Sequence, residues 1–215
     1  MKNLFILLTF ALIFSSQAFA AGVFGPAQPE GKAGEISVGT GYFYYNSEWD
    51  GDLRAEQNEG YVQVGYAITD KIGAYLMGGA ADLDFGPFND GFRPFGAVGV
   101  KWLITDRAPV GVGAFAQFAY FDDYESGGTT TRNNYEATGG VVLQTVIEGA
   151  YLYGGPLFFT REGSAYGTIK GHYEEQSNFG GMAGVRWPIK NNIVVDLETQ
   201  YKTKLSVGTA IHFNF

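Results

Sequence analysis

From residue 34 to the C-terminus, hydrophobic and polar residues alternate along most of the chain. The clearest run is the last one, where every second residue is apolar or threonine: Leu205, Val207, Thr209, Ile211, Phe213 and Phe215. The residues between them are polar or small, and a period of two places the two sets on opposite faces of a β-strand. The same alternation recurs and predicts an all-β protein of ten strands, over 34–45, 59–68, 72–85, 94–104, 110–121, 135–146, 150–161, 178–188, 193–202 and 204–215.

Short and long connections alternate between these strands. A signature of an aromatic residue, an isoleucine and a short polar turn occurs at 66–71, 102–107 and 187–192, with a degenerate copy at 146–149. Longer polar stretches lie between these turns, at 46–58, 86–93, 122–134 and 162–177. The strands therefore form hairpins with short turns at one end and long loops at the other. The last connection, 202–204, is unusually short for a long-loop end, so eight strands with longer loops is the alternative.

The positions of the aromatic residues indicate which face of the sheet meets lipid. Tyr66, Trp102 and Trp187 lie on the apolar face at the strand ends next to the short turns, as in an interfacial girdle. The opposite girdle is expected at Tyr42, Tyr44 and Tyr120. A propeller would need its own blade motifs, and a soluble barrel would expose this tryptophan band to water. The pattern thus predicts a transmembrane antiparallel up-and-down β-barrel, because closed barrels satisfy strand backbones within lipid.

The first twenty residues have the three parts of a secretory signal. Lys2 gives a positive start, Leu4 to Phe14 is an apolar run, and Ala18-Phe19-Ala20 is a small-x-small cleavage pattern. We expect residues 1–20 to be a signal peptide that is cleaved after Ala20. Residues 21–33 are expected to be an N-terminal periplasmic lead, and residues 34–215 the transmembrane barrel.

Composition excludes several classes of function. Charged residues make up 17% of the chain, against about 25% in typical soluble proteins. With no cysteine and only two histidines, we expect no metal site, no cofactor and no catalytic residue. The net charge of −8 becomes −9 without the signal peptide, which removes one lysine and no acid, and this argues against nucleic acid as a partner.

The face opposite the apolar one carries charged residues that would point into the barrel. We expect a structural network of paired charges there, formed by Lys101, Glu136, Arg186, Asp196, Glu198 and His212. A turn at 190–192 places Arg186 directly opposite Asp196, because Trp187 and Val195 must both face lipid. A filter for small solutes is the alternative use of these residues.

The last fifth of the chain resembles the end of small bacterial outer-membrane barrels of the OmpA-like and OmpX-like kind. The resemblance rests on 184–187, on 196–201 and on the terminal aromatic Phe215. It implies a cell outer membrane location in a Gram-negative bacterium, with lipid and lipopolysaccharide as surroundings. It also implies a C-terminal signal for the outer-membrane assembly machinery at Ile211, Phe213 and Phe215. The implied role is structural or surface-interacting, with a narrow lumen filled by side chains. A small-solute pore is the alternative, and the loop partner stays open.

A weaker resemblance is to omptins, ten-stranded outer-membrane proteases with acidic residues and an Asp-x-His pair at the outer rim. Asp82 and Asp84 could stand for the carboxylates and His172 for the histidine. The position two before His172 is Lys170 rather than aspartate, so the match fails there. Protease activity is therefore the third and least favoured function.

Overall fold

The structure is a computed structural model that describes residues 22–49, 53–85, 88–107, 109–168, 170–190 and 192–215. Every regular element within these ranges is a β-strand, and they contain no helix long and apolar enough to cross a membrane. The strands are β1 (Ile36–Trp49), β2 (Leu53–Ala67), β3 (Ile72–Phe85), β4 (Phe88–Thr105), β5 (Gly111–Phe121), β6 (Glu125–Ser126), β7 (Thr129–Ile147), β8 (Ala150–Gly167), β9 (Gly171–Glu174), β10 (Phe179–Lys190), β11 (Ile193–Tyr201) and β12 (Leu205–Asn214).

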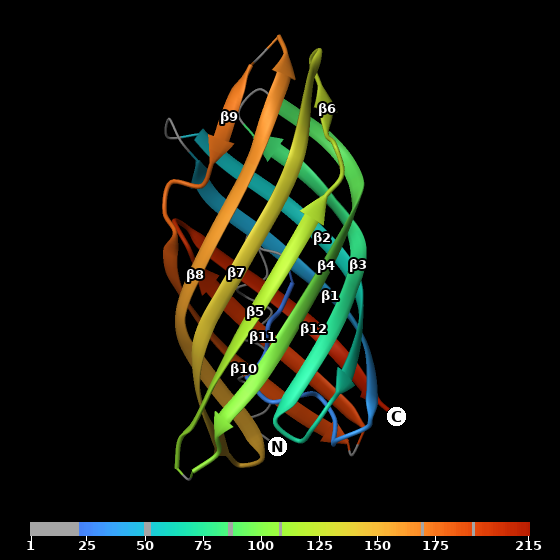
Figure 1. Cartoon of the computed structure of the whole chain (residues 1–215), viewed down its shortest axis with the longest axis vertical. Helices are drawn as coiled ribbons and strands as arrows, with labels where there is room; N and C mark the ends of the chain where they lie inside the picture. The colour runs from blue at the N-terminus through green and yellow to red at the C-terminus, as the bar shows by residue number, and fades with distance from the viewer. Residues whose placement is uncertain (1–21, 50–52, 86–87, 108, 169, 191) are drawn as a thin grey trace, which may run out of the picture.

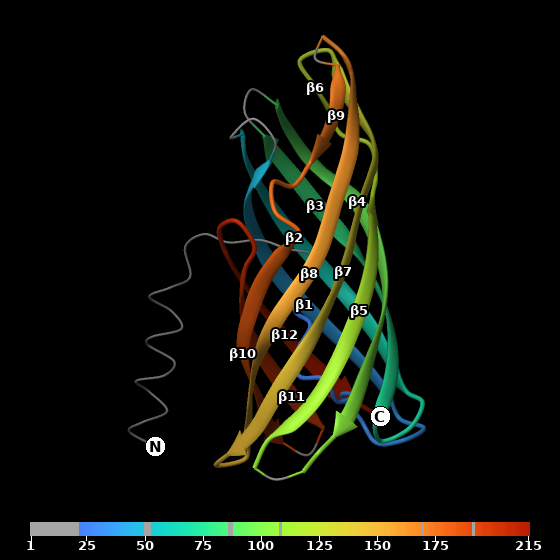
Figure 2. The same cartoon turned by 60° about the vertical axis from the view of Figure 1, so that its left-hand side comes forward.

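In the described part of the chain, ten of these strands form a closed antiparallel barrel (Figures 1 and 2). Neighbours around the wall run from β1 to β5, continue through β7 and β8, and end with β10, β11 and β12. The ring closes where β12 pairs with β1. At this seam the N–H of Phe215 donates to the carbonyl of Ile36 at 2.9 Å, and the N–H of Ile36 donates to the carbonyl of Phe215 at 3.2 Å. The prediction of ten strands is confirmed, and the alternative of eight is wrong.

The short turns lie at the predicted end, but two of the predicted long loops, 46–58 and 86–93, are mostly strand. Residues 46–49 belong to β1 and residues 53–58 to β2, and β4 begins at Phe88 rather than at residue 94. At the short-turn end, β7 and β8 are joined by Glu148 and Gly149, both with positive φ, which is the conformation of the tightest hairpin turns. At the long-loop end, the last hairpin turns within three residues, and the N–H of Lys202 donates to the carbonyl of Lys204 at 3.2 Å. The first and last strands both have their free ends at the short-turn side, where Ser37 pairs with Asn214.

Strands β7 and β8 are longer than the sequence predicts and project beyond the rest of the barrel. They pair as far as Thr129 and Gly167, and the short strands β6 and β9 pair with their upper ends (Figure 2). We call β6, β9 and the upper ends of β7 and β8 the outer sheet. Its residues are polar on both faces because neither face meets lipid, so the alternation that marks a membrane strand is absent although backbone pairing continues.

The outer face of the barrel carries the apolar band that lipid requires. Val64, its paired neighbours Val38 and Leu76, and Val98 all have exposed side chains on this face. All six predicted girdle residues also lie on this face. Near the short turns, Tyr66 and Trp102 are about half exposed and Trp187 is partly buried. Toward the long loops, Tyr42 and Tyr120 are about half exposed and Tyr44 is partly buried. The wall thus presents a hydrophobic belt between two aromatic rings.

The N-terminal segment lies inside the barrel, which corrects the expected periplasmic lead. In Figure 1 this blue segment runs inside the barrel, surrounded by the strands, and its residues from Gly22 to Ala27 are buried. The chain leaves the lumen near Glu30, passes the short-turn end at 31–35 and begins β1. Small residues and prolines suit this position, because a narrow lumen has little room beside a second backbone. We call residues 22–30 the plug.

The face assignment predicts how introduced charges act. Arginine in place of Val64, in the middle of the apolar band, should lower the free energy of unfolding by about 2–4 kcal/mol because its charge faces hydrocarbon. Arginine at Ile68, an outward residue just past the end of β2, should cost at most about 1 kcal/mol because it reaches the interface. Urea unfolding in lipid vesicles measures both. Equal losses would show that the apolar band is misplaced.

Candidate functional site

The lumen contains two clusters of charged and aromatic side chains, one toward each end of the barrel. The lower cluster, toward the short turns, consists of Glu30, Lys101, Arg186, Asp196 and His212. The upper cluster, toward the long loops, consists of Tyr45, Glu59, Glu136, Arg161, Glu175 and Lys202. Nearly all of these side chains are buried, although their strands face lipid on the other side. Charges in such a position are stable only when they are paired.

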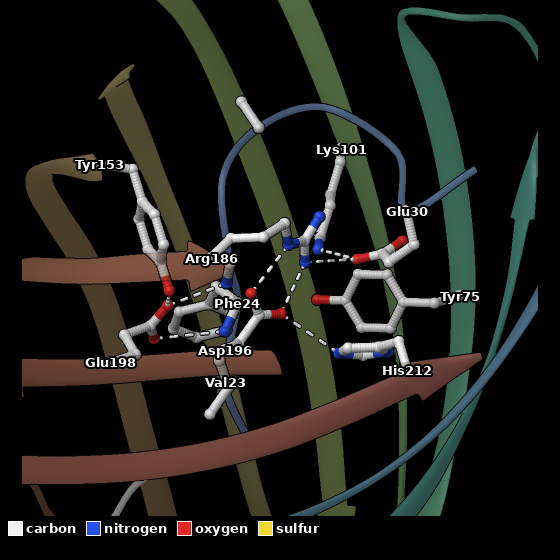
Figure 3. A network of polar contacts seen from close by, with 12 residues as sticks. Val23, Phe24, Glu30, Tyr75, Lys101, Tyr153, Arg186, Asp196, Glu198 and His212 are labelled. Carbon is white, nitrogen blue, oxygen red and sulfur yellow. Dashed lines mark hydrogen bonds and ion pairs between the residues drawn. The ribbon is translucent and has the colours of Figure 1, made fainter. Parts of the chain in front are cut away.

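Arg186 and Asp196 form the centre of the lower cluster (Figure 3). The guanidinium donates from Nε to Oδ1 of Asp196 at 2.8 Å and from one terminal nitrogen to Oδ2 at 2.7 Å. This fork is the strongest form of a charge-assisted hydrogen bond. The two residues face each other across β10 and β11, and Trp187 faces Val195, so the predicted register is confirmed.

Three further groups complete the lower cluster. The carboxylate of Glu30, from the plug, accepts hydrogen bonds from Arg186 at 3.1 Å and from the ammonium group of Lys101 on β4. The imidazole of His212, on β12, has its Nε2 3.2 Å from Oδ2 of Asp196. The cluster therefore joins the plug to four strands, β4, β10, β11 and β12.

Glu198 connects the wall directly to the backbone of the plug. Its carboxylate accepts hydrogen bonds from the N–H groups of Phe24 at 3.2 Å and Gly25 at 2.8 Å. The hydroxyl of Tyr153, on β8, donates to the same carboxylate at 3.0 Å (Figure 3). The side-chain amide of Gln200 donates to it at 2.7 Å. One buried carboxylate thus satisfies two plug donors that would otherwise lack partners.

Other strands hold the plug from the opposite walls. The N–H of Val23 donates to the hydroxyl of Tyr61 on β2 at 3.0 Å. The N–H of Ala27 donates to Gln144 on β7 at 3.0 Å, and the amide of Gln144 donates back to Gln28 at 2.8 Å. The ring of Phe24 stacks on Phe115 with their centroids 4.3 Å apart. These contacts from several strands position the plug as a packed part of the core.

The upper cluster fills the other half of the lumen with side chains of the wall. The ammonium group of Lys202 donates to Glu136 at 2.8 Å and lies 4.7 Å from the centre of the Phe159 ring. The guanidinium of Arg161 lies between the rings of Tyr45 and Phe121, 4.8 and 4.7 Å from their centres. Cations against aromatic faces are stabilised when water is excluded. The charged side chains of this cluster all come from the wall strands and from the segment after β9.

The sequence pattern assigned these residues only in part. Of the six predicted network residues, Lys101, Arg186, Asp196 and His212 come together in the lower cluster and Glu198 lies beside it, whereas Glu136 belongs to the upper cluster. The predicted network does not include Lys202 or Arg161. Lys202 adjoins the short turn at 202–204, and its sequence position therefore suggests a surface residue. The signal for Glu30 and the plug is weak, since the nearest strand partner of Glu30 is 71 residues away and that of Val23 is 38 residues away.

Glu175 shows the charge balance of the upper cluster. It follows β9, beyond the strands that span the membrane, and its side chain is nevertheless buried. Burial and the nearby Glu136 together raise the pKa of Glu175 to about 7, although Lys202 and Arg161 oppose this shift. The upper cluster therefore holds more carboxyl groups than its two cations can pair.

A cavity of about 620 Å³ opens at the short-turn end of the lumen. Gln28, Glu30, Lys32, Asp106, Arg107 and Tyr151 are among the residues that line it. Its lining includes plug residues, so the cavity ends where the plug begins. No group of three or more histidine, cysteine or carboxylate side chains that could hold a metal ion occurs within the described ranges.

The proposed rim residues are not assembled into a catalytic constellation. Asp82 accepts hydrogen bonds from the backbone and side chain of Asn58, and Asp84 accepts one from Asn89. The imidazole of His172 instead faces Glu162, with 3.6 Å between Nε2 and Oε2. The three side chains thus have separate partners in the structure, and the omptin-like arrangement is absent from the described residues.

The lower cluster predicts strong coupling between Arg186 and Asp196. Replacing Arg186 with methionine alone should lower the free energy of unfolding by about 3–5 kcal/mol, because it leaves buried carboxylates without their cation. Adding Asp196→Leu should recover part of that loss. A double-mutant cycle from urea unfolding measures the coupling. Lys204→Met, which removes the exposed ion pair of Lys204 with Glu48, is the control and should cost at most about 1 kcal/mol. Additive effects of the first two changes would contradict the network.

Comparison with known proteins identifies the fold. Neither the protein-family models nor the characterised sequences gave a match. Among solved structures, the chain is similar to an outer-membrane channel from Pseudomonas putida F1, with a TM-score of 0.55, 9% identity, and 91% of this chain and 100% of that chain covered. It is also similar to the transport unit of the autotransporter AIDA-I from Escherichia coli, with a TM-score of 0.50, 14% identity, and 89% and 92% of the two chains covered. The chain therefore has the fold of the Gram-negative outer-membrane β-barrel proteins.

Proposed function

We propose that this protein is a closed outer-membrane barrel that conducts no solute in its resting form and acts as a structural or surface-interacting protein. One observation carries the proposal: both halves of the lumen are occupied. The plug fills the lower half, bonded to Glu198, Tyr61 and Gln144. Wall side chains fill the upper half, where Tyr45, Phe121 and Tyr124 are fully buried. A lumen packed in this way leaves no continuous path for water.

The long-loop end is the part of the molecule that supports a surface role. The outer sheet extends beyond the membrane belt and is itself held by ordered contacts. Asp90 accepts hydrogen bonds from Arg93 at 2.9 Å and from the N–H of Glu125 at 2.6 Å, and these donors lower the pKa of its carboxyl despite partial burial. A rigid projecting surface is suited to contact with another molecule, because little entropy is lost on binding.

Location and surroundings follow from the same proposal. Residues 1–20 act as a signal peptide for export, and the barrel is folded into the outer membrane by the assembly machinery there. Outer-membrane lipid contacts the apolar band, and lipopolysaccharide contacts the belt next to the long loops. Ile211, Phe213 and Phe215 lie on the outer face of the last strand, where an assembly factor can reach them before the seam with β1 closes.

A pore gated by the plug is the second candidate function. The cavity at the short-turn end favours it, because a solute can enter the lumen from that side as far as the plug. The plug is joined to the wall by hydrogen bonds and ion pairs, so a partner that removed it would expose a polar lower lumen. In this alternative the upper cluster must also rearrange.

Conductance in a planar bilayer distinguishes the two candidates. The wild-type barrel should give no stable steps. A variant with a Gly/Ser segment of equal length in place of residues 22–30 should also be silent, because the upper cluster still closes the lumen. Adding Tyr45→Ala and Phe121→Ala to that variant should open a path and serves as the positive control. Steps from the wild type, or from the Gly/Ser variant alone, would favour the pore.

The C-terminal residue should matter for assembly more than for stability. The side chain of Phe215 is 73% exposed, so deleting it removes few packing contacts beyond its backbone bonds to Ile36. We expect several-fold less folded barrel in the outer membrane, measured as the heat-modifiable band on a detergent gel. Phe215→Tyr keeps an aromatic end and should restore the normal amount. A normal amount of the truncated chain would contradict the assembly signal.

A further inference from the structure

The connection between β9 and β10 lies against the upper lumen (Figure 2). We call its residues 175–178 the strap. The backbone N–H of Glu175 donates to the carbonyl of Arg161 on β8 at 3.1 Å. The N–H of Gln176 donates to the carbonyl of Glu48 on β1, also at 3.1 Å. Strands β10, β11 and β12 lie between β8 and β1 in the wall, so the strap crosses the long-loop end of these three strands.

Glu175 is the residue that fixes the strap to the interior. The residues on either side of it, Glu174 and Gln176, are exposed, whereas Glu175 is only 4% exposed. Neither of its carboxyl oxygens has a hydrogen-bond partner of good geometry among the described residues, although the hydroxyl of Tyr45 lies beside it. A carboxyl group buried in this way favours its protonated form, because its charge is not solvated.

The charges around Glu175 favour the same form. Four elements place charged or titratable groups against it: Tyr45 from β1, Glu136 from β7, Arg161 from β8 and Lys202 from the turn after β11. Glu59, on β2, faces the same two cations and Glu136. Three carboxyl groups therefore share two cations, and one negative charge is left without a countercharge when all three are ionised.

The other members of the cluster are fixed by the wall. The ammonium group of Lys202 donates to Glu136 at 2.8 Å, and a terminal nitrogen of Arg161 donates to the side chain of Gln57 on β2 at 2.6 Å. Two of the three carboxyl groups, those of β2 and β7, belong to strands that cannot move without opening the barrel. The third, that of Glu175, lies in a connection and can leave the cluster while the ten strands stay paired.

We propose that the strap is a proton-controlled latch, which lies in the lumen while the carboxyl of Glu175 carries its proton and detaches when that proton passes to water. Detachment brings the carboxylate into solvent and breaks the backbone bonds to Arg161 and Glu48. It also uncovers the upper cluster toward the long-loop side. The surface at this end of the barrel therefore has two forms, one in acidic surroundings and one in neutral or alkaline surroundings.

The direction of the pH effect follows from the two positions of the carboxyl. In the lumen the pKa of Glu175 is about 7, and on a detached strap it returns to the ordinary value of 4.5. The attached strap therefore binds the proton more tightly. Attachment is strongest below pH 4.5, weakens as the pH rises from 4.5 to 7, and changes no further above that range. The total weakening is roughly 300-fold, because each pKa unit corresponds to a factor of ten.

Hydrogen exchange of the whole folded barrel in detergent micelles tests the latch. Mass spectrometry of the peptide that covers the strap reports on the amides of Glu175 and Gln176. The rate of the wild type is divided at each pH by that of Glu175→Gln, which stays neutral, so the intrinsic pH dependence of exchange cancels. We expect a ratio of about 1 at pH 4.5 that rises about tenfold or more by pH 8, because the wild-type strap opens more often.

Glu174→Gln is the matched control, because this neighbouring glutamate is exposed. Its exchange should follow the wild type at every pH. A ratio that stays flat from pH 4.5 to 8, or a rise that Glu174→Gln also abolishes, would overturn the latch.

A measurement on the wild type alone makes the test independent of how well Glu175→Gln folds. Its exchange is divided at each pH by that of the unfolded chain, and the strap is compared with residues 129–132 of the outer sheet. Loss of protection between pH 4.5 and 7 should be confined to the strap, and an equal loss in the outer sheet would contradict the latch. Conductance is a separate matter, because Tyr45 and Phe121 fill the upper lumen from β1 and β5 in both forms.

Discussion

Exclusion of water from the inner face is the constraint on which the rest of the structure depends. A closed ten-stranded wall satisfies its own backbone, but it leaves charged side chains facing a narrow interior. Arg186 resolves this for the lower half, because one guanidinium binds Asp196 from the wall and Glu30 from the plug. The plug therefore contributes charge as well as volume, because its Glu30 carboxylate pairs with Lys101 and Arg186 of the wall.

The two halves of the lumen are closed by different means. The lower half depends on the plug, which brings Phe24 against Phe115 and its own N–H groups to Glu198. The upper half depends on side chains of the wall strands, with Arg161 and Lys202 packed against aromatic rings. The charged groups of the upper cluster thus come from outside the plug, although Gly22 of the plug adjoins Glu59.

The sequence predicts the wall well and the plug poorly, for a physical reason. Lipid on one face and a filled lumen on the other impose a strict period of two, so even the pairing of Arg186 with Asp196 follows from keeping Trp187 and Val195 outward. Residues 22–30 have no such period, since they are surrounded on all sides. Their partners are wall groups such as Glu198, 173 residues from Gly25. Nothing local in a Gly/Pro-rich stretch indicates so distant a contact.

Sequence separation also sets the order in which the parts can form. The hairpin of β10 and β11 brings Arg186 and Asp196 together over ten residues, so this pair can exist early. His212 can join the pair with the next strand, because β12 pairs with β11, whereas Lys101 comes from β4 and joins only when the wall closes. The site that receives Glu30 is therefore complete only in the closed barrel. The plug is also bonded to the last strand, because the side-chain amide of Asn214 donates to the carbonyl of Glu30 at 2.6 Å.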